Sequence, residues 1–291
     1  MTQPAATSSH VAVIGAGTMG HGIAQVCAMA GHRVTLADAT AELAQRGVDR
    51  VRGNLEEGVK RGKLDAAMVD AHMMRITASG SLDTACADAD IVIEAVPEKL
   101  ELKQDVLQRA ERAAPASAML ATNTSSLGIG GMQHWLARPA QFIGLHFFNP
   151  VHINKLVEVV RGPETSDATV ARALELVSDI GRTSVLVNDS PGFATSRLGV
   201  LLGLEAMRMV EKGVASAADI DTAMELGYRH PMGPLKLTDL VGLDVRLDIA
   251  RYLHQELGTE QYRPPRILVQ MVEEGRLGRK SGRGFYDWSE E

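Results

Sequence analysis

The stretch that decides the fold is His10–Gly20, HVAVIGAGTMG. A β-branched run, residues 10–14, leads directly into three glycines, Gly15, Gly17 and Gly20, and an apolar helical pattern then continues through Ala30. In such a strand–loop–helix unit the first glycine permits a tight turn, the second lets the backbone approach a diphosphate and the third lets helix and strand pack closely. The diphosphate would lie at the helix N-terminus, where free N–H groups and the helix dipole favour an anion. The stretch therefore predicts a dinucleotide-binding unit.

The next segment indicates which dinucleotide is bound. Gly31 ends the helix, and residues 33–37 form a second predicted strand that leads to Asp38, 18 positions after Gly20. A carboxylate at about this spacing hydrogen-bonds the adenosine ribose hydroxyls. It would repel a 2′-phosphate, and the following Ala39 and Thr40 offer no compensating charge, so the sequence favours NAD over NADP.

Further strands and helices alternate along the first half of the chain. We expect a long amphipathic helix over residues 40–62, strands at 75–77, 91–96 and 119–121, and a helix at 100–113. The run at 91–96 is continuously apolar, as in a strand buried on both faces of a parallel sheet. It ends near Glu98, and the strand at 119–121 ends in TNTSS, residues 122–126. Residues just past the carboxyl ends of such strands line the ligand crevice, so this cluster of hydroxyl and amide groups is predicted to bind a substrate oxygen or the nicotinamide.

A predicted hairpin follows, with strands at residues 142–148 and 156–160. If these strands pair antiparallel about His152, then His146 lies opposite Glu158, with their Cβ atoms about 5 Å apart. This pairing would give a general base with an orienting acid. The alternative is an ordinary hairpin with a structural histidine. His146 lies towards the end of its strand, at the same predicted sheet edge as the glycine loop and the TNTSS cluster.

The second half of the chain has little strand character after a last strand at residues 183–187. Residues 188–192, NDSPG, suggest a hinge, so we expect a Rossmann-type domain with a mostly parallel sheet at 1–188 and an all-α domain at 189–291. Helices are predicted at 193–212, 217–226, 235–257 (interrupted near Gly242) and 264–275. The first is apolar on more than one face, which favours a homodimer through this domain.

Composition excludes several classes of function. The 291-residue chain has a formal net charge of -6 and a pI near 5.9, which argues against nucleic acid or an anionic membrane as the main partner. No apolar run approaches the roughly 18 residues that span a bilayer, and the first nine residues lack the features of an export signal. Cys27 and Cys86 lack metal-type spacing, so we expect no metal and a cytoplasmic protein with reduced thiols.

Taken together, six motifs resemble one family. VIGAGTMGHGIAQ, IEAVPE, TNTSSL, GLHFFNPVHINKLVEVV, DSPGF and GRKSGRGFYDW are similar to segments of the short-chain L-3-hydroxyacyl-CoA dehydrogenases, and within them of the bacterial 3-hydroxybutyryl-CoA dehydrogenases. The resemblance covers nearly the whole chain. It implies oxidation of the 3-hydroxyl of a short acyl-CoA with NAD as cofactor.

The resemblance also implies roles for individual residues. His146 would be the catalytic base and Glu158 its orienting carboxylate, with Ser125 and Asn149 as neighbours of the substrate and nicotinamide. The implied NAD-binding residues are Gly15, Gly17, Thr18, Met19, Gly20, Asp38, Glu98, Lys103, Ser125, Asn149 and Lys280. CoA would lie near Asn54 and Arg61, although the cations at the end of the long helix are also typical of a solvated helix terminus.

One position departs from the family pattern, and two alternatives stay open. Ser196 stands where many members carry an active-site Asn, so its role as a substrate-binding residue rests on a single hydroxyl without the amide. The substrate could instead be a free hydroxy acid or sugar acid. The chain could also be a dinucleotide-binding protein without turnover, against which His146 and Glu158 argue.

Overall fold

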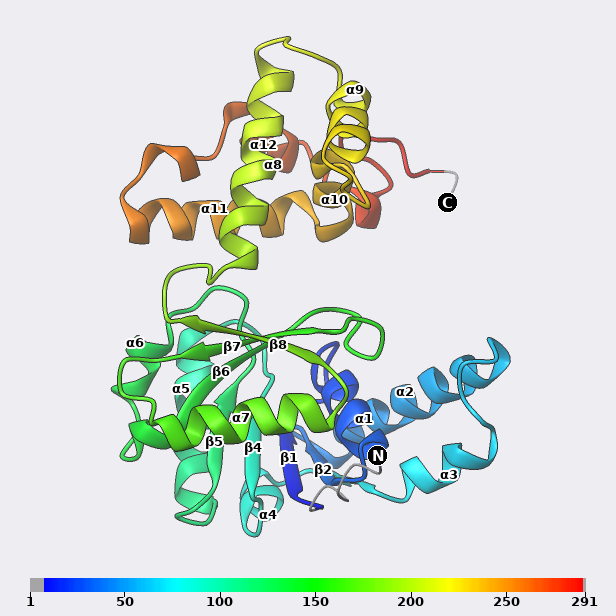
Figure 1. The fold of residues 1–291 in the computed structure, drawn as a ribbon, viewed down its shortest axis with the longest axis vertical. Coiled ribbons are helices and arrows are strands. Elements are labelled where there is room, and N and C mark those ends of the chain that lie inside the picture. Colours follow the sequence, from blue (N-terminus) through cyan, green and yellow to red (C-terminus); the bar gives the residue numbers. More distant parts are fainter. Residues whose placement is uncertain (1–7, 290–291) are drawn as a thin grey trace. The chain divides into compact units, whose positions relative to one another are not determined.

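The chain divides into two compact units, Met1–Asp189 and Ser190–Glu291. The computed structural model describes residues 8–289 (Figure 1), so most of the N-terminal segment that we examined for an export signal lies outside the described residues. Within those residues no helix has both the length and the apolar character that a membrane span needs.

The first unit is built on one eight-stranded sheet with the strand order β3-β2-β1-β4-β5-β6-β7-β8. The strands are β1 (His10–Ile14), β2 (Arg33–Ala37), β3 (Ile76–Ser79), β4 (Ile91–Glu94), β5 (Met119–Thr122), β6 (Phe142–Phe147), β7 (Leu156–Arg161) and β8 (Thr183–Asn188). All neighbours pair parallel except β6 and β7. The predicted Rossmann-type, mostly parallel sheet is thus confirmed.

The chain order reverses between β1 and β4, because β2 and β3 lie on one side of β1 and the later strands on the other. Ile14 pairs with Glu94, Glu94 with Thr122, and Thr122 with Gly144. The carboxyl ends of β1, β4, β5 and β6 therefore meet at one edge of the sheet. Ligands of open α/β sheets bind outside this edge, at the point where the strand order reverses.

Helices cover both faces of this sheet. They are α1 (Gly20–Met29), α2 (Ala41–Lys60), α3 (Ala67–Met73), α4 (Leu82–Cys86), α5 (Leu100–Ala113), α6 (Ile129–Gln133) and α7 (Asp167–Asp179), with a short 3₁₀ turn η1 (Pro139–Gln141). Side chains cap several of their starts, since the hydroxyls of Thr40, Ser81 and Ser166 accept the N–H groups of Leu43, Thr84 and Thr169. Each such cap contributes about 1 kcal/mol.

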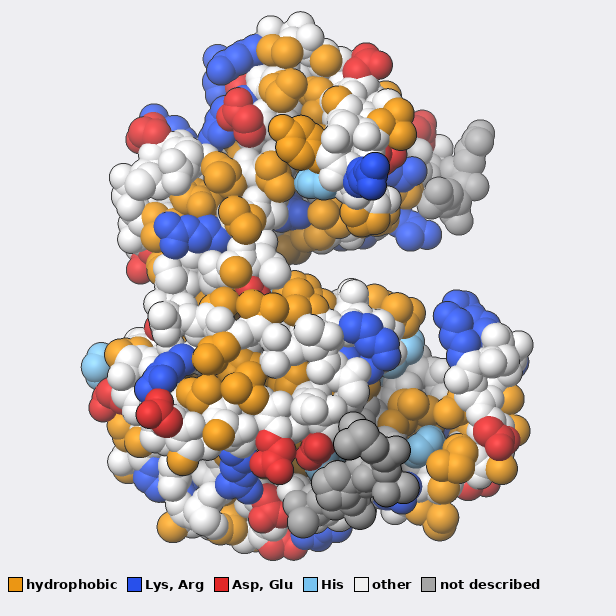
Figure 2. Space-filling model, viewed as in Figure 1, with side chains coloured by type: hydrophobic (Ala, Val, Ile, Leu, Met, Phe, Trp, Pro, Cys, Tyr) orange, Lys and Arg blue, Asp and Glu red, His pale blue; other side chains and the backbone are white. Residues whose placement is uncertain are grey.

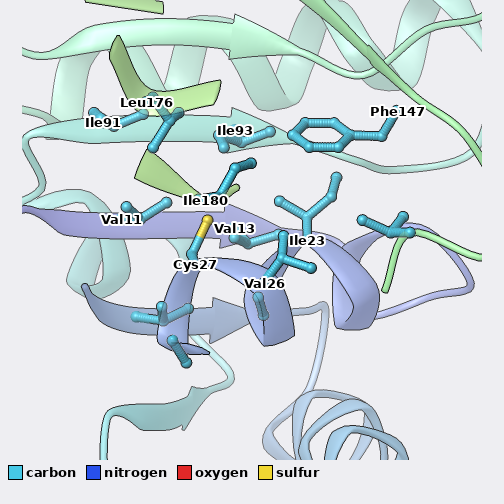
Figure 3. Packing of buried hydrophobic residues seen from close by; sticks show 14 of the residues in the cluster. Val11, Val13, Ile23, Val26, Cys27, Ile91, Ile93, Phe147, Leu176 and Ile180 are labelled. Atoms are coloured by element: carbon cyan, nitrogen blue, oxygen red, sulfur yellow. The ribbon is translucent and has the colours of Figure 1, made fainter. Parts of the chain in front are cut away.

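The core on one face joins α1 and α7 to the middle of the sheet (Figure 3). Ile23 and Leu176 come from the two helices and meet Val13, Ile93 and Phe147 from the strands, all at most 4% exposed. Burying each such side chain contributes about 1.5–3 kcal/mol. This packed core therefore fixes the positions of the strand ends at which the candidate site residues lie.

The second unit is helical among its described residues, as predicted. It contains α8 (Thr195–Glu211), α9 (Ala217–Thr222), a π-helical turn η2 (Ala223–Gly227), α10 (Pro234–Val241), α11 (Leu243–Leu257), η3 (Glu260–Tyr262), α12 (Arg266–Glu273) and η4 (Arg279–Ser281). Its core is formed by Val200, Leu204, Leu243, Leu253 and Leu268, each at most 1% exposed. The predicted interruption near Gly242 is confirmed, because this residue adopts φ +103° between α10 and α11.

Candidate active site

The glycine loop after β1 has the geometry of a diphosphate cradle. Gly15 adopts φ +103°, and a Cβ there would lie 2.7 Å from the Ala95 carbonyl oxygen. A Cβ on Gly20 would lie only 1.6 Å from the Gly15 carbonyl oxygen, whereas one on Gly17 would meet nothing within 4 Å. Gly15 and Gly20 are therefore required by the protein itself, and Gly17 faces open space into which a ligand can approach. Thr18 and Met19 complete the loop at the start of α1.

This geometry predicts that Gly20→Ala weakens dinucleotide binding. The added methyl group has to displace the Gly15 carbonyl, and such overpacking costs about 1–3 kcal/mol. A loop that must take its binding conformation against this cost should bind NAD with a Kd raised about 5- to 150-fold. Isothermal titration calorimetry measures this change. Gly53→Ala is the matched control, because a Cβ on this α2 residue meets nothing within 4 Å. Wild-type affinity in the Gly20 variant would contradict the role of the loop.

Asp38 lies at the end of β2, beside the glycine loop. One carboxylate oxygen accepts the Ala16 N–H and the other accepts the Ala39 N–H, each at 2.7 Å. These hydrogen bonds hold the carboxylate in place next to the loop, where it can accept hydrogen bonds from ribose hydroxyls. The neighbouring Ala39 and Thr40 carry no charge that could receive a 2′-phosphate.

His146 and Glu158 face each other across β6 and β7 in the register that the sequence predicted. The Nδ1 atom of His146 lies 2.7 Å from a Glu158 Oε2, and the two residues are 6% and 0% exposed. The Phe148 ring packs against the imidazole, with centroids 4.2 Å apart. The carboxylate thus binds the Nδ1 side of the ring and holds both its orientation and its tautomer.

A buried charge network at the ends of β4 and β5 was not predicted from the sequence. Glu94 and Lys103 are both fully buried, and the Lys103 ammonium donates to both carboxylate oxygens of Glu94 at 2.9 Å. Glu94 also accepts the Val96 N–H at 2.7 Å and the Thr122 hydroxyl at 2.5 Å. Burial raises the pKa of Glu94, while Lys103 and these donors oppose that rise.

The same ammonium extends the network to the TNTSS loop. Lys103 donates to the Asn123 carbonyl oxygen at 2.9 Å and lies 3.2 Å from a Glu98 carboxylate oxygen. Glu98 in turn accepts the Thr124 hydroxyl and, at 3.1 Å, the Ser125 N–H. The side-chain oxygen of Asn123 accepts the Phe147 N–H at 3.1 Å, next to His146. One network therefore holds the loop that carries Ser125 against the strand that carries His146.

The structure brings some predicted site residues to this edge and leaves others elsewhere. Ser125 and Asn149 lie at the ends of β5 and β6, and the Asn149 carbonyl oxygen accepts the Asn154 side chain at 2.8 Å. Asn54 lies on α2, and its side-chain amide donates to the Gln25 side-chain oxygen at 3.0 Å. Arg61 is bound to Glu57 at 2.8 Å.

Ser196 and Lys280 belong to the second unit. Ser196 lies in the first turn of α8, and the Lys280 ammonium is 2.5 Å from an Asp244 carboxylate oxygen. The C-terminal segment around Lys280 is held by buried Asp239, which accepts the N–H groups of Phe285 and Tyr286 and the indole N–H of Trp288, each at 2.9 Å. These contacts fix the C-terminal segment against α10.

Models of two protein domains match the chain almost end to end. Residues 10–190 match "3-hydroxyacyl-CoA dehydrogenase, NAD binding domain" and residues 192–288 match "3-hydroxyacyl-CoA dehydrogenase, C-terminal domain". The chain belongs to the 3-hydroxyacyl-CoA dehydrogenase family. It is therefore an NAD-binding oxidoreductase with an acyl-CoA substrate, which confirms at this level the enzyme class, the cofactor and the substrate class predicted from the sequence.

Individual relatives of this 3-hydroxyacyl-CoA dehydrogenase agree. It is 44% identical over 280 residues to a probable 3-hydroxybutyryl-CoA dehydrogenase of Bacillus subtilis, covering 96% of this chain and 97% of the relative. A 3-hydroxybutyryl-CoA dehydrogenase of Bradyrhizobium diazoefficiens is 41% identical, with 98% and 97% covered. The crystal structure of (S)-3-hydroxybutyryl-CoA dehydrogenase from Ralstonia eutropha superposes with a TM-score of 0.94 at 40% identity, over 97% of this chain and 99% of that chain.

Proposed function

We propose that this enzyme interconverts (S)-3-hydroxyacyl-CoA and 3-ketoacyl-CoA, with 3-hydroxybutyryl-CoA among its substrates and His146 as the general base. The observation that carries the proposal is the 2.7 Å contact between His146 Nδ1 and Glu158, two buried side chains at the ligand-binding edge of the sheet. Relatives named 3-hydroxybutyryl-CoA dehydrogenases at 44% and 41% identity support the substrate.

In this mechanism the Nε2 atom of His146 takes the proton of the 3-hydroxyl. Glu158 accepts a hydrogen bond from the Nδ1–H group of His146 and so orients the ring. It also stabilises the imidazolium that forms, as a buried carboxylate does for a catalytic histidine. Bound NAD supplies the acceptor for the hydride that leaves C3. In the reverse direction the imidazolium returns its proton to the 3-keto oxygen.

Other residues position the reactants. The Ser125 hydroxyl would bond the substrate oxygen, and Asn149 would bond the substrate or the nicotinamide. We assign the diphosphate to the loop of Gly15, Gly17, Thr18, Met19 and Gly20, the ribose to Asp38, and the nicotinamide half to Glu98, Lys103 and Lys280. Ser196 would contact the acyl group with a single hydroxyl, and Asn54 and Arg61 would lie near CoA.

A substrate comparison tests the proposal. Oxidation of 3-hydroxybutyryl-CoA is measured beside that of free 3-hydroxybutyrate, by the appearance of NADH. We expect the thioester to be the better substrate, because enzymes use binding energy from remote parts of a substrate to raise the rate. Equal rates would overturn the CoA assignment and favour a free hydroxy acid as the substrate.

We also infer a homodimer formed through the second unit. Leu198, Leu202, Leu226 and Tyr228 are 62%, 43%, 79% and 76% exposed, and hydrophobic side chains gather on the viewed face of this unit over α8 and α9 (Figure 2). A soluble monomer rarely exposes large contiguous apolar patches.

Analytical ultracentrifugation should therefore give about twice the 31.2 kDa mass of one chain, because a second copy would cover this apolar surface. Leu198→Glu, which would place a charge in the buried contact, should shift the sedimentation towards one chain. A wild-type monomer at micromolar concentration would contradict the inference.

A further inference from the structure

The strand that carries His146 extends further than the strand beside it. β6 pairs with β5 only over residues 142–144, because β5 ends at Thr122. Its pairing with β7 on the other side continues to Phe147. His146 lies two residues past the last pair between β5 and β6, on a part of the strand that has a neighbouring strand on one side only.

The side chain of Asn123 takes the place of the missing strand on the β5 side. Asn123 follows Thr122 directly, and its side-chain oxygen accepts the N–H of Phe147 at 3.1 Å. That nitrogen belongs to the peptide group that joins His146 to Phe147, so the hydrogen bond holds the backbone immediately after His146. Of the two polar atoms of the amide only the oxygen can accept an N–H, and this contact therefore fixes the orientation of the amide.

The side chain of Phe147 fixes the same part of the backbone from another direction. It is 3% exposed and packs in the core near Ile93 and Ile23 (Figure 3). Successive side chains of a strand point to opposite faces of the sheet, so His146 projects from the other face, where Glu158 lies 2.7 Å from its Nδ1 atom. A displacement of the backbone at Phe147 would therefore move the imidazole.

The backbone of Asn123 is itself held by two hydrogen bonds. Its N–H donates to the Glu94 carbonyl oxygen at 2.7 Å, and its carbonyl oxygen accepts the fully buried Lys103 ammonium at 2.9 Å. The same ammonium binds both carboxylate oxygens of Glu94. The side chain that holds Phe147 thus projects from a backbone that the buried charge pair keeps in place.

We propose that Asn123 is a positioning residue for the reaction, and that it places the imidazole of His146 through the Phe147 N–H. A base must lie within hydrogen-bond reach of the proton that it removes, and a misplacement of about 1 Å can lower the rate about 100-fold. In this role Asn123 contacts Phe147 and not the reacting atoms. The inference rests on the proposed function, in which His146 is the base.

Turnover by side-chain variants of Asn123 tests the role. Asn123→Leu removes the acceptor but keeps a similar volume and the backbone carbonyl that binds Lys103. It should lower kcat for 3-hydroxybutyryl-CoA about 10- to 100-fold and leave the Kd for NAD near its wild-type value, which also shows that the variant is folded. Asn123→Ser, a smaller change with a hydroxyl too short to replace the amide oxygen, should show the same loss.

Asn123→Asp is the variant that should regain most of the lost rate. Aspartate has nearly the same shape as asparagine and keeps an oxygen that can accept the Phe147 N–H, with a charge that strengthens the hydrogen bond. A rate as low as that of Asn123→Leu would contradict the positioning role.

Gln141→Leu is the matched control. Gln141 immediately precedes β6, at the end opposite His146, and its side chain donates to the Ala116 carbonyl oxygen at 2.8 Å. The variant thus also removes one hydrogen bond between a side chain and the backbone near this strand, and it should retain wild-type turnover. An equal loss of rate in this variant would show that any such hydrogen bond matters equally, and the role assigned to Asn123 would fall.

A double variant separates an effect on the base from a general effect on the enzyme. If Asn123 acts through His146, kcat of His146→Gln and of Asn123→Leu/His146→Gln should agree within about twofold, because no imidazole remains to be misplaced. The same fold-loss from Asn123→Leu in both backgrounds would overturn the inference. So would a Kd for NAD that rises in parallel with the loss of rate, since Asn123 would then act in cofactor binding.

Proton NMR of the Nδ1–H group of His146 follows the imidazole without any turnover. The His146→Gln variant identifies this signal by its loss. Asn123→Leu should shift the signal and Asn123→Asp should restore it, while Gln141→Leu should leave it unchanged. An unchanged signal in Asn123→Leu would overturn the inference and leave the proposed function intact, whereas full turnover by His146→Gln would contradict the proposed base itself.

Discussion

His146→Gln is expected to lower kcat by about two to four orders of magnitude, which is the usual contribution of a general base. Glutamine fills a similar volume and can still donate to Glu158, but it cannot take the proton of the 3-hydroxyl. The diphosphate loop and Asp38 are untouched, so NAD should bind with nearly wild-type affinity. Steady-state rates and a calorimetric NAD titration on the same preparation measure the two quantities.

Two further variants sharpen this result. His152→Gln alters a half-buried histidine in the connection of the same hairpin and should retain wild-type turnover. Glu158→Gln keeps a hydrogen bond to the ring but removes the charge that stabilises the imidazolium, so its kcat should also fall while NAD binding persists. Full turnover by the His146 variant would remove this residue from the role of base.

Lys103→Met is expected to lower the free energy of unfolding by about 3–5 kcal/mol, because it leaves the Glu94 carboxylate buried without a counter-charge. Both side chains of the pair are 0% exposed. The double variant Glu94→Gln/Lys103→Met removes both charges and should regain most of the lost stability, since a buried ion pair is often no more stabilising than uncharged groups of similar volume. Urea unfolding of the three proteins measures the coupling.

The matched control for this prediction is Lys99→Met, which changes an exposed lysine at the start of the same helix and should alter stability by no more than about 0.5 kcal/mol. A single Lys103 variant as stable as the wild type would show that the pair does not hold the site. So would a double variant no more stable than the single one.

The sequence predicts best those parts of the site that depend on short-range geometry. The glycine loop is read from a strand, three glycines and a helix in succession. The opposition of His146 and Glu158 follows from the spacing of two strands about His152, because register within a hairpin is set locally by the apolar pattern of the strands and by the turn type and length of their connection. Both predictions need no knowledge of the rest of the molecule.

The charge network illustrates what spacing does not reveal. Glu94 ends an apolar run and resembles the last residue of a buried strand, while Lys103 lies in a helix that is mostly polar. Their contact forms only because α5 packs against β4 in the folded protein, and this packing is not encoded in the local sequence pattern. A carboxylate at the end of a fully buried strand, followed within one turn of the next helix by a lysine, is the signal that could have revealed the pair.

Helix boundaries in the second unit also depended on backbone details. The predicted helix over 193–212 begins only at Thr195, because Gly192 and Phe193 adopt positive φ angles of +74° and +51°. The predicted helix over 217–226 ends as an α-helix at Thr222 and continues as a π-helical turn. Such single turns of π-helix occur within or next to α-helices, and the residue types at 223–227 do not distinguish the two forms.

The proposed reaction is tested most directly by the reduction of acetoacetyl-CoA with NADH and NADPH side by side, followed by the loss of reduced-cofactor absorbance. We expect rapid reduction by the wild type with NADH, a much slower reaction with NADPH because of Asp38, and almost none by the His146→Gln variant. No reduction of acetoacetyl-CoA by the wild type, or equal rates for the wild type and the variant, would contradict it.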